Sequence, residues 1–122
     1  MIRGVGVDLV GIKRVEAMLD KPGFLDRFFT PGERAYVRGR GGAGAQSAAG
    51  IYAAKEAVLK AMGTGIAPVG LAEVAVTHSE TGAPQAELGP KALARMLELG
   101  AERVLLSITH DAGMAVAVAV IE

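Results

Sequence analysis

A chain of 122 residues, of which 51% are hydrophobic, can form a single core, and we expect one domain spanning residues 1–122. The formal net charge is zero, so the chain as a whole is not expected to bind nucleic acid or a membrane surface. Cysteine is absent, which excludes a thiol nucleophile, a disulfide framework and a cysteine-ligated metal site.

The charge is unevenly distributed along the chain. Residues 1–40 contain eight Lys/Arg and five Asp/Glu, whereas residues 41–122 contain five and eight. The positive N-terminal third suits a partner with an acidic surface. The N-terminus lacks the apolar core of a signal peptide, and no apolar run has the length of a membrane span. We therefore expect a cytoplasmic protein, in agreement with the absence of cysteine.

The chain begins with a strand-like segment over residues 2–10. Its residues alternate between a valine-rich face, which we expect to pack on the core, and a nearly bare face with Gly4 and Gly6 that carries Asp8. A carboxylate in such an apolar segment must be paired, protonated or bound to a cation. The two glycines leave room for a ligand or for another backbone.

Three helices are expected next. The first covers residues 12–19, and the second begins at residues 30–33, where threonine, proline and glutamate form a capping signal. The third is an alanine-rich helix over residues 46–62 that Gly63 ends. The glycine-rich residues 39–45 predict a flexible loop between the second and third helices.

The C-terminal half predicts four strands and one helix. Strands are expected at 71–78 and 84–88, then a helix over 90–99, then a hairpin of strands at 103–110 and 114–121. The resulting order, β-α-α-α-β-β-α-β-β, predicts a single α+β domain with a mainly antiparallel sheet and one long central helix.

The long helix has two distinct faces. Its apolar stripe should face the core, and consists of Ile51, Ala54, Val58 and Met62. Glu56 and Lys60 are neighbours on another stripe, together with Tyr52. Their spacing is typical of a surface ion pair, and a charged functional face is the alternative.

The residues beyond this helix and Asp8 suggest phosphate and metal chemistry. Gly63-Thr64-Gly65 follows a helix, so it is not a P-loop; it is either a glycine stop or a phosphate contact supported by Lys60. Asp8 and Glu56 together would form a hard oxygen site suited to Mg²⁺.

A serine, a histidine and an aspartate occur together at residues 107–111. In a strand Ser107 and Thr109 point to one face and His110 to the other, so a hydrolase triad is not expected. His110 is either a ligand contact or acid–base group, or a structural histidine.

Four segments stand in order along the chain: GVGVDLV (4–10), FTPGE (29–33), AAKEAVLKAMGTG (53–65) and SITH (107–110). Together they resemble the holo-acyl-carrier-protein synthase family, the short, single-domain class of 4′-phosphopantetheinyl transferase. The resemblance runs over nearly the whole chain, and the AAKEA segment followed by Gly-Thr-Gly is its most specific part.

The resemblance implies that Asp8 and Glu56 bind Mg²⁺ and act in catalysis with Lys60, which lies near the pyrophosphate of coenzyme A. Contacts with coenzyme A are expected from Lys60, Gly63, Thr64, Gly65, Thr109 and His110. Arg14 and Arg27 are candidates for binding an acidic acyl carrier protein, with plain surface charges as the alternative.

The resemblance also implies a homotrimer with active sites at subunit interfaces. We expect the interface on the strands over residues 103–121, whose apolar side chains are Val104, Leu106, Ile108, Val116, Val118 and Val120.

The implied reaction is phosphoryl-type transfer in fatty acid and lipid biosynthesis. A serine hydroxyl of the carrier attacks the phosphorus on the pantetheine side of coenzyme A, and 3′,5′-ADP leaves. The protein mainly positions groups and neutralises charge. The general base is either a metal-polarised water or Glu56.

Two alternatives remain at this point. One is a non-catalytic coenzyme A-binding module, suggested by Ile51, which stands where the family usually has an arginine. The other is a different Mg²⁺-dependent pyrophosphate hydrolase, which would need more carboxylates clustered on one helix than this chain has.

Overall fold

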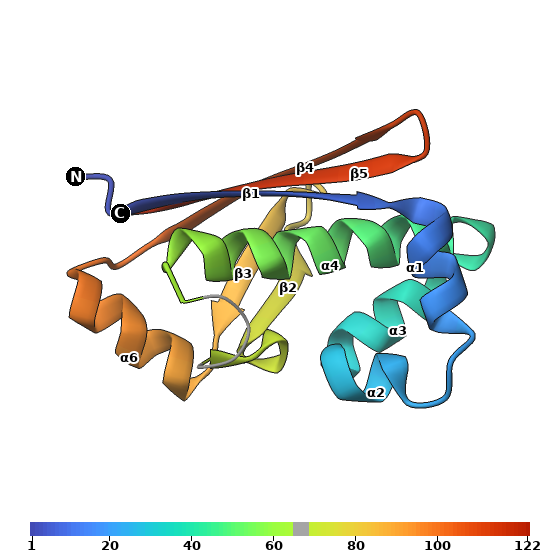
Figure 1. Ribbon diagram of the computed structural model, residues 1–122, viewed down its shortest axis with the longest axis horizontal. Helices are drawn as coiled ribbons and strands as arrows, with labels where there is room; N and C mark the ends of the chain where they lie inside the picture. The colour runs from blue at the N-terminus through green and yellow to red at the C-terminus, as the bar shows by residue number, and fades with distance from the viewer. Residues whose placement is uncertain (65–68) are drawn as a thin grey trace.

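An 18-residue helix, α4 (Gly44–Ala61), runs through the centre of the molecule, as Figure 1 shows. The structure is a computed structural model that describes residues 1–64 and 69–122. Four elements precede α4: β1 (Gly4–Gly11), α1 (Ile12–Leu19), α2 (Phe24–Phe28) and α3 (Pro31–Gly39). After it come β2 (Val74–His78), β3 (Pro84–Leu88), α6 (Pro90–Leu99), β4 (Val104–Asp111) and β5 (Met114–Ile121).

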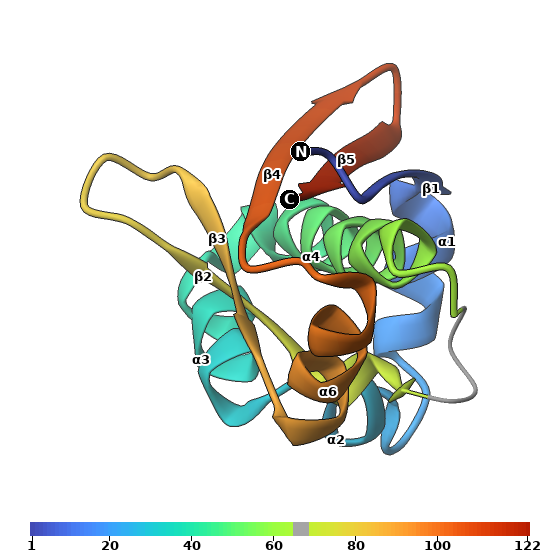
Figure 2. The same ribbon diagram turned by 90° about the vertical axis from the view of Figure 1, so that its left-hand side faces the viewer.

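The strands form two antiparallel sheets. One has the order β1-β5-β4 and lies along one side of α4, and the other is the β2-β3 hairpin. Figure 2 shows the hairpin extending beside α3, with α6 below the end of α4. The α+β class, the antiparallel pairing and the long central helix are therefore as the sequence predicts.

The core surrounds α4, with the three-stranded sheet on one side and side chains of α2, α3, β2 and α6 on the other. All four members of the predicted apolar stripe are buried. On the sheet side, Ala115, Ala117 and Ala119 of β5 are buried as well, and such small side chains let the helix approach the sheet closely. None of the helices in the described ranges is long and apolar enough to cross a bilayer. The cytoplasmic location stays a prediction.

Local helix signals are confirmed where they were strongest. The Thr30 hydroxyl accepts from the Glu33 N–H at 3.3 Å, and the Thr30 N–H donates to Glu33 Oε1 at 2.8 Å, which is a complete capping box at the start of α3. Gly100 adopts a φ of 68° just after α6, a left-handed conformation that glycine adopts at low cost.

Three expectations are wrong. The valine-rich face of β1 is exposed, and its glycine face packs on α4. Residues 39–45 are not a flexible loop: α3 ends at Gly39, a 3₁₀ turn covers Gly41–Ala43, and α4 begins at Gly44. The short helix α2, which packs Phe24 into the core, was not expected, because it has too few residues to show a helical period.

Candidate active site

The two glycines of β1 bring the strand against the backbone of α4. A Cβ on Gly6 would lie 1.9 Å from the Ala57 carbonyl oxygen, and one on Gly4 would lie 2.0 Å from that of Ala61. No side chain larger than hydrogen fits at that distance. Because side chains two apart share a strand face, Asp8 also points toward α4.

Asp8 and Lys60 form the ion pair of this region. Lys60 Nζ lies 2.9 Å from Asp8 Oδ1 and donates to the Val7 carbonyl at 3.2 Å. The hydrogen bond to Asp8 is the main cause that raises the pKa of Lys60, with added attraction from the charges of Asp8 and Glu56. Lys60 therefore pairs with a residue 52 positions away, and Glu56 on its own helix acts on it through its charge.

Glu56 is half-buried, between Tyr52 and the Asp8–Lys60 pair. Partial burial raises the pKa of the Tyr52 hydroxyl, and the charge of Glu56 and a hydrogen bond to it raise it further. Arg14 lowers that pKa by its positive charge and Asp8 raises it. Asp8, Arg14, Tyr52, Glu56 and Lys60 therefore belong to one electrostatic neighbourhood. The sequence placed Tyr52 on this stripe but gave no sign of its bond to Glu56.

This set of donors fits a magnesium ion that shares its coordination with substrate. Asp8 and Glu56 would offer two carboxylates as hard oxygen ligands, and Mg²⁺ commonly uses one or two carboxylates together with water and phosphate oxygens. The described part of the chain contains no group of three or more His, Asp or Glu that could hold a metal by protein ligands alone. Lys60 beside them adds a positive charge that attracts phosphate.

The end of α4 leads directly from this face into the predicted phosphate loop. Gly63 is exposed with a φ of 71°, and the Thr64 N–H and hydroxyl are directed to the Leu59 carbonyl at 3.3 and 3.5 Å. Arg95 Nε of α6 donates to the Met62 carbonyl at 3.0 Å and holds the helix end. Gly65 lies outside the described residues.

His110 lies away from this site within the same subunit. It lines a pocket of about 180 Å³ with Arg40, Gln46 and Ile51, and its Nε2 is 2.9 Å from Gln46 Nε2. Positions 46 and 60 are separated by about 21 Å along a helix axis. Thr109 lies on the opposite, outer face of the sheet, paired with Val116.

The pocket also bears on Ile51, which stands where the resembling family usually has an arginine. Ile51 is fully packed, with 1% exposure, so the side chain belongs to the core. A cation does line the same pocket, because Arg40 stands beside it with its Nε 3.3 Å from Ser47 Oγ. The sequence contained Arg40 but no pattern that linked it to position 51.

The two candidate carrier-binding arginines are both exposed. Arg14 lies on α1, close enough to the site for its charge to act on Tyr52. Arg27 lies on α2, with its guanidinium carbon 5.2 Å from the centre of the Phe28 ring. Both belong to the positive N-terminal third of the chain.

Comparison with known proteins identifies the class. The sequence pattern of the 4′-phosphopantetheinyl transferase superfamily matches residues 4–119, nearly the whole chain. The chain belongs to this family.

Within that superfamily the chain is similar to holo-[acyl-carrier-protein] synthases. It is 42% identical over 122 residues to the enzyme of Treponema denticola, covering 100% of this chain and 99% of that one. It is 41% identical over 123 residues to an enzyme of Clostridium botulinum strain Eklund 17B, covering 100% and 98%.

Solved structures of such synthases share the fold. That from Neisseria meningitidis has a TM-score of 0.89 and 33% identity, covering 100% of this chain and 99% of that one. That from Helicobacter pylori, a complex with coenzyme A, has a TM-score of 0.84 and 32% identity, covering 97% and 99%.

Proposed function

We propose that the chain transfers 4′-phosphopantetheine from coenzyme A to a serine of an acyl carrier protein and releases 3′,5′-ADP. Full-length similarity to holo-[acyl-carrier-protein] synthases supports the reaction. The observation that ties it to this structure is the face where Asp8, Glu56 and Lys60 come together. In the reaction the serine oxygen bonds to the pantetheine-side phosphorus, the bond from that phosphorus to the bridging oxygen breaks, that oxygen leaves on the 5′-phosphate of 3′,5′-ADP, and the serine proton is released.

We assign separate roles to these three side chains. Asp8 and Glu56 would hold Mg²⁺, which, when bound, neutralises charge on the phosphate oxygens. Lys60 is protonated at neutral pH, as lysine ordinarily is, and its raised pKa favours the charged form further. Its ammonium can therefore offset the charge that grows on the departing 5′-phosphate of 3′,5′-ADP. Gly63, Thr64 and Gly65 follow directly on the chain and are proposed to contact the same phosphates.

The test of this function is mass spectrometry of an apo acyl carrier protein incubated with the chain, coenzyme A and Mg²⁺. The expected result is a gain of the phosphopantetheine mass, lost with Asp8→Asn and with Glu56→Gln. Coenzyme A cleavage without carrier modification would indicate a pyrophosphate hydrolase. Binding of coenzyme A without either product would indicate a non-catalytic module.

We further propose that the active unit is a homotrimer. Large apolar side chains on the outer face of the three-stranded sheet are exposed by 39–62%, namely Val5, Val7, Leu9, Leu105 and Val118. Such a face is large for a monomer surface and suits burial against another copy. The apolar side chains that the sequence analysis assigns to the interface lie on two different faces of the sheet. Val118 points outward, whereas Leu106 and Ile108 pack toward the core.

The trimer would also explain the position of His110. Its distance from Lys60 within one subunit leaves it without a place in that subunit's site. At an interface, His110 and Thr109 of one copy can reach the coenzyme A bound on the Asp8–Glu56 face of its neighbour. We therefore propose these two residues as contacts for coenzyme A across the interface.

A further inference from the structure

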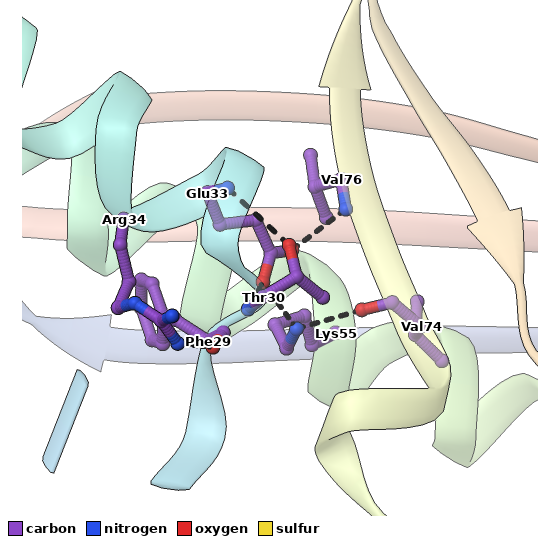
Figure 3. Close-up of polar contacts among 7 residues, drawn as sticks. All are labelled: Phe29, Thr30, Glu33, Arg34, Lys55, Val74 and Val76. Atoms are coloured by element: carbon purple, nitrogen blue, oxygen red, sulfur yellow. Dashed lines mark hydrogen bonds and ion pairs between the residues drawn. The ribbon is translucent and has the colours of Figure 1, made fainter. Parts of the chain in front are cut away.

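A buried ion pair connects three elements behind the proposed site. Lys55 of α4 has 0% exposure and Glu33 of α3 has 1%, and Lys55 Nζ lies 2.6 Å from Glu33 Oε1. Figure 3 shows the pair enclosed between α3, α4 and β2. The two residues are 22 positions apart, and neither takes part in the chemistry proposed above.

Both side chains also bond to strand β2. Lys55 Nζ donates to the Val74 carbonyl at 2.7 Å, and Glu33 Oε2 accepts from the Val76 N–H at 2.7 Å. Along a strand the backbone polar groups of successive residues point to alternate edges, so residues two apart share an edge. The Glu73 carbonyl accepts from the Gly89 N–H, which follows β3, and therefore points to the β3 side. Val74 and Val76 thus present their polar groups at the edge of β2 that faces away from β3.

The pair replaces a neighbouring strand at that edge. In a parallel ladder, one residue of the neighbouring strand makes two bonds to the existing strand. Its N–H donates to the carbonyl of one residue, and its own carbonyl accepts from the N–H of the residue two positions further along that strand. Lys55 and Glu33 supply that donor and that acceptor as side chains. The remaining bond, from the Thr30 N–H to Glu33 Oε1 at 2.8 Å, joins the start of α3 to the same point.

This arrangement fixes α4 at the residue directly before Glu56. Lys55 is held by an acid and a carbonyl from two other elements, so the helix can neither rotate nor slide at this position without breaking buried bonds. Glu56, the next residue, leaves the helix about 100° further round, on the side where its charge acts on Lys60. The backbone position from which the Glu56 side chain extends is therefore set by the buried pair.

We propose that the Lys55–Glu33 pair is a positioning device that aims Glu56 at the metal and phosphate site. The inference rests on the proposed function. It predicts that loss of the pair weakens divalent-metal binding, by about tenfold if the effect resembles that of other residues that orient metal ligands. It predicts a similar rise in the Mg²⁺ concentration that gives half-maximal transfer.

The test compares single and double replacements of the pair. Lys55→Met leaves Glu33 buried without a counter-charge, so it loses stability and metal affinity together. The double variant Glu33→Leu/Lys55→Met replaces both charges by apolar groups, which often restores stability, but it does not restore the link to β2. Met96→Ala, at a buried position of α6, serves as a destabilised control on a helix that contains neither member of the pair.

Metal affinity is measured directly, by electron paramagnetic resonance of free Mn²⁺ during titration, below the melting temperature of every variant. We expect weakened Mn²⁺ binding in both the single and the double variant and unchanged binding in Met96→Ala. Recovery of metal affinity together with stability in the double variant would reduce the pair to a structural contact and overturn the inference. If Lys55→Met does not fold, Glu33→Gln, which keeps the side-chain size, replaces it.

The same experiment separates the two proposals. If the unmodified chain neither binds Mn²⁺ nor modifies the carrier, the proposed function is wrong, whatever the pair does. If the unmodified chain does both and the double variant binds Mn²⁺ normally, the positioning role alone fails.

Discussion

At the scale of single residues, the site differs from what a helical wheel suggests. Helical spacing predicts that Lys60 lies beside Glu56. In the structure its ion-pair partner is Asp8 of β1, with Nζ 2.9 Å from Oδ1. An ammonium that donates to both a carboxylate and a carbonyl is more restricted than a freely mobile surface lysine. That geometry makes Lys60 suitable for stabilising a developing negative charge.

The corresponding prediction concerns turnover. Lys60→Ala should lower kcat by about 10²–10³-fold, the loss typical of one electrostatic contact at a reacting centre, because the charge it neutralises grows in the transition state. Lys60→Arg should recover only part, since a planar guanidinium does not replace a compact ammonium. Steady-state kinetics with a melting curve as folding control measure both. Near-normal turnover in Lys60→Ala would return the residue to a surface role.

A second prediction at this scale concerns acid stability. His78 stacks on Tyr36 with ring centres 4.1 Å apart, and burial, then the charge of Arg40, lowers the pKa of His78. Below about pH 6.5 the unfolded chain binds a proton on His78 that the folded chain does not. Stability is therefore lost as the pH falls through that range.

Chemical unfolding at pH 7.5 and pH 5 checks this effect. His78→Phe keeps a flat ring beside Tyr36 but cannot bind a proton, so it should lose less stability than the unmodified chain over the same interval. Equal losses would show that other groups account for the pH dependence.

At the scale of elements, the closeness of β1 to α4 is what brings Asp8 to the site. Gly6→Ala would place a methyl group 1.9 Å from the Ala57 carbonyl oxygen and 2.6 Å from the Ala61 nitrogen. Both are backbone atoms, so the strand must move. We expect a loss of at least about 2 kcal/mol in unfolding free energy, with reduced transfer activity because Asp8 moves with the strand.

Gly32→Ala provides the matched control for that change. A Cβ at Gly32 meets no atom within 4 Å, and the position is in the first turn of α3, where alanine favours helix. The control should be neutral or stabilised by up to about 1 kcal/mol. Thermal unfolding of the two variants side by side decides the point; similar stabilities would contradict the close packing of β1 on α4.

The elements also show how far sequence patterns reach. Helix bounds such as those of α1 and α6 were predicted well because caps and breakers act within a few residues. Alternation in β1 defined two faces but could not tell which one α4 covers. The Lys55–Glu33 and Lys60–Asp8 pairs join residues 22 and 52 positions apart, and no local pattern predicts such partners. For the site, family resemblance supplied Asp8 and Glu56, and the structure supplied their neighbours.

At the scale of the whole molecule, the positive N-terminal third gives a prediction for the carrier. Arg14 is exposed on α1 next to the site, where a long-range attraction would bring an acidic protein close to the phosphates. Arg14→Glu should raise KM for the carrier about tenfold, and by more than it raises KM for coenzyme A, whose phosphates also lie within reach of this charge. Lys91→Glu, the same charge change on the exposed first turn of α6, should leave KM unchanged; an equal rise would point to net charge alone.

The outer face of the three-stranded sheet gives the last prediction, on assembly. Val7 and Val118 are register partners at the middle of this face, exposed by 56% and 39%. A lysine at Val7 would put a charge into any interface formed there, at a cost that a contact between apolar side chains cannot offset. Val7→Lys should therefore be monomeric in light scattering at micromolar concentration, whereas the unmodified chain should be a trimer.

Leu97→Lys is the control for that experiment, because Leu97 on α6 is 81% exposed and lies outside the sheet face. It should remain trimeric and active. Since the proposed site takes His110 from a neighbouring copy, the Val7→Lys monomer should also lose transfer activity while keeping its fold by circular dichroism. An unmodified chain that is monomeric, or a Val7→Lys monomer with full activity, would show that each subunit completes its site alone.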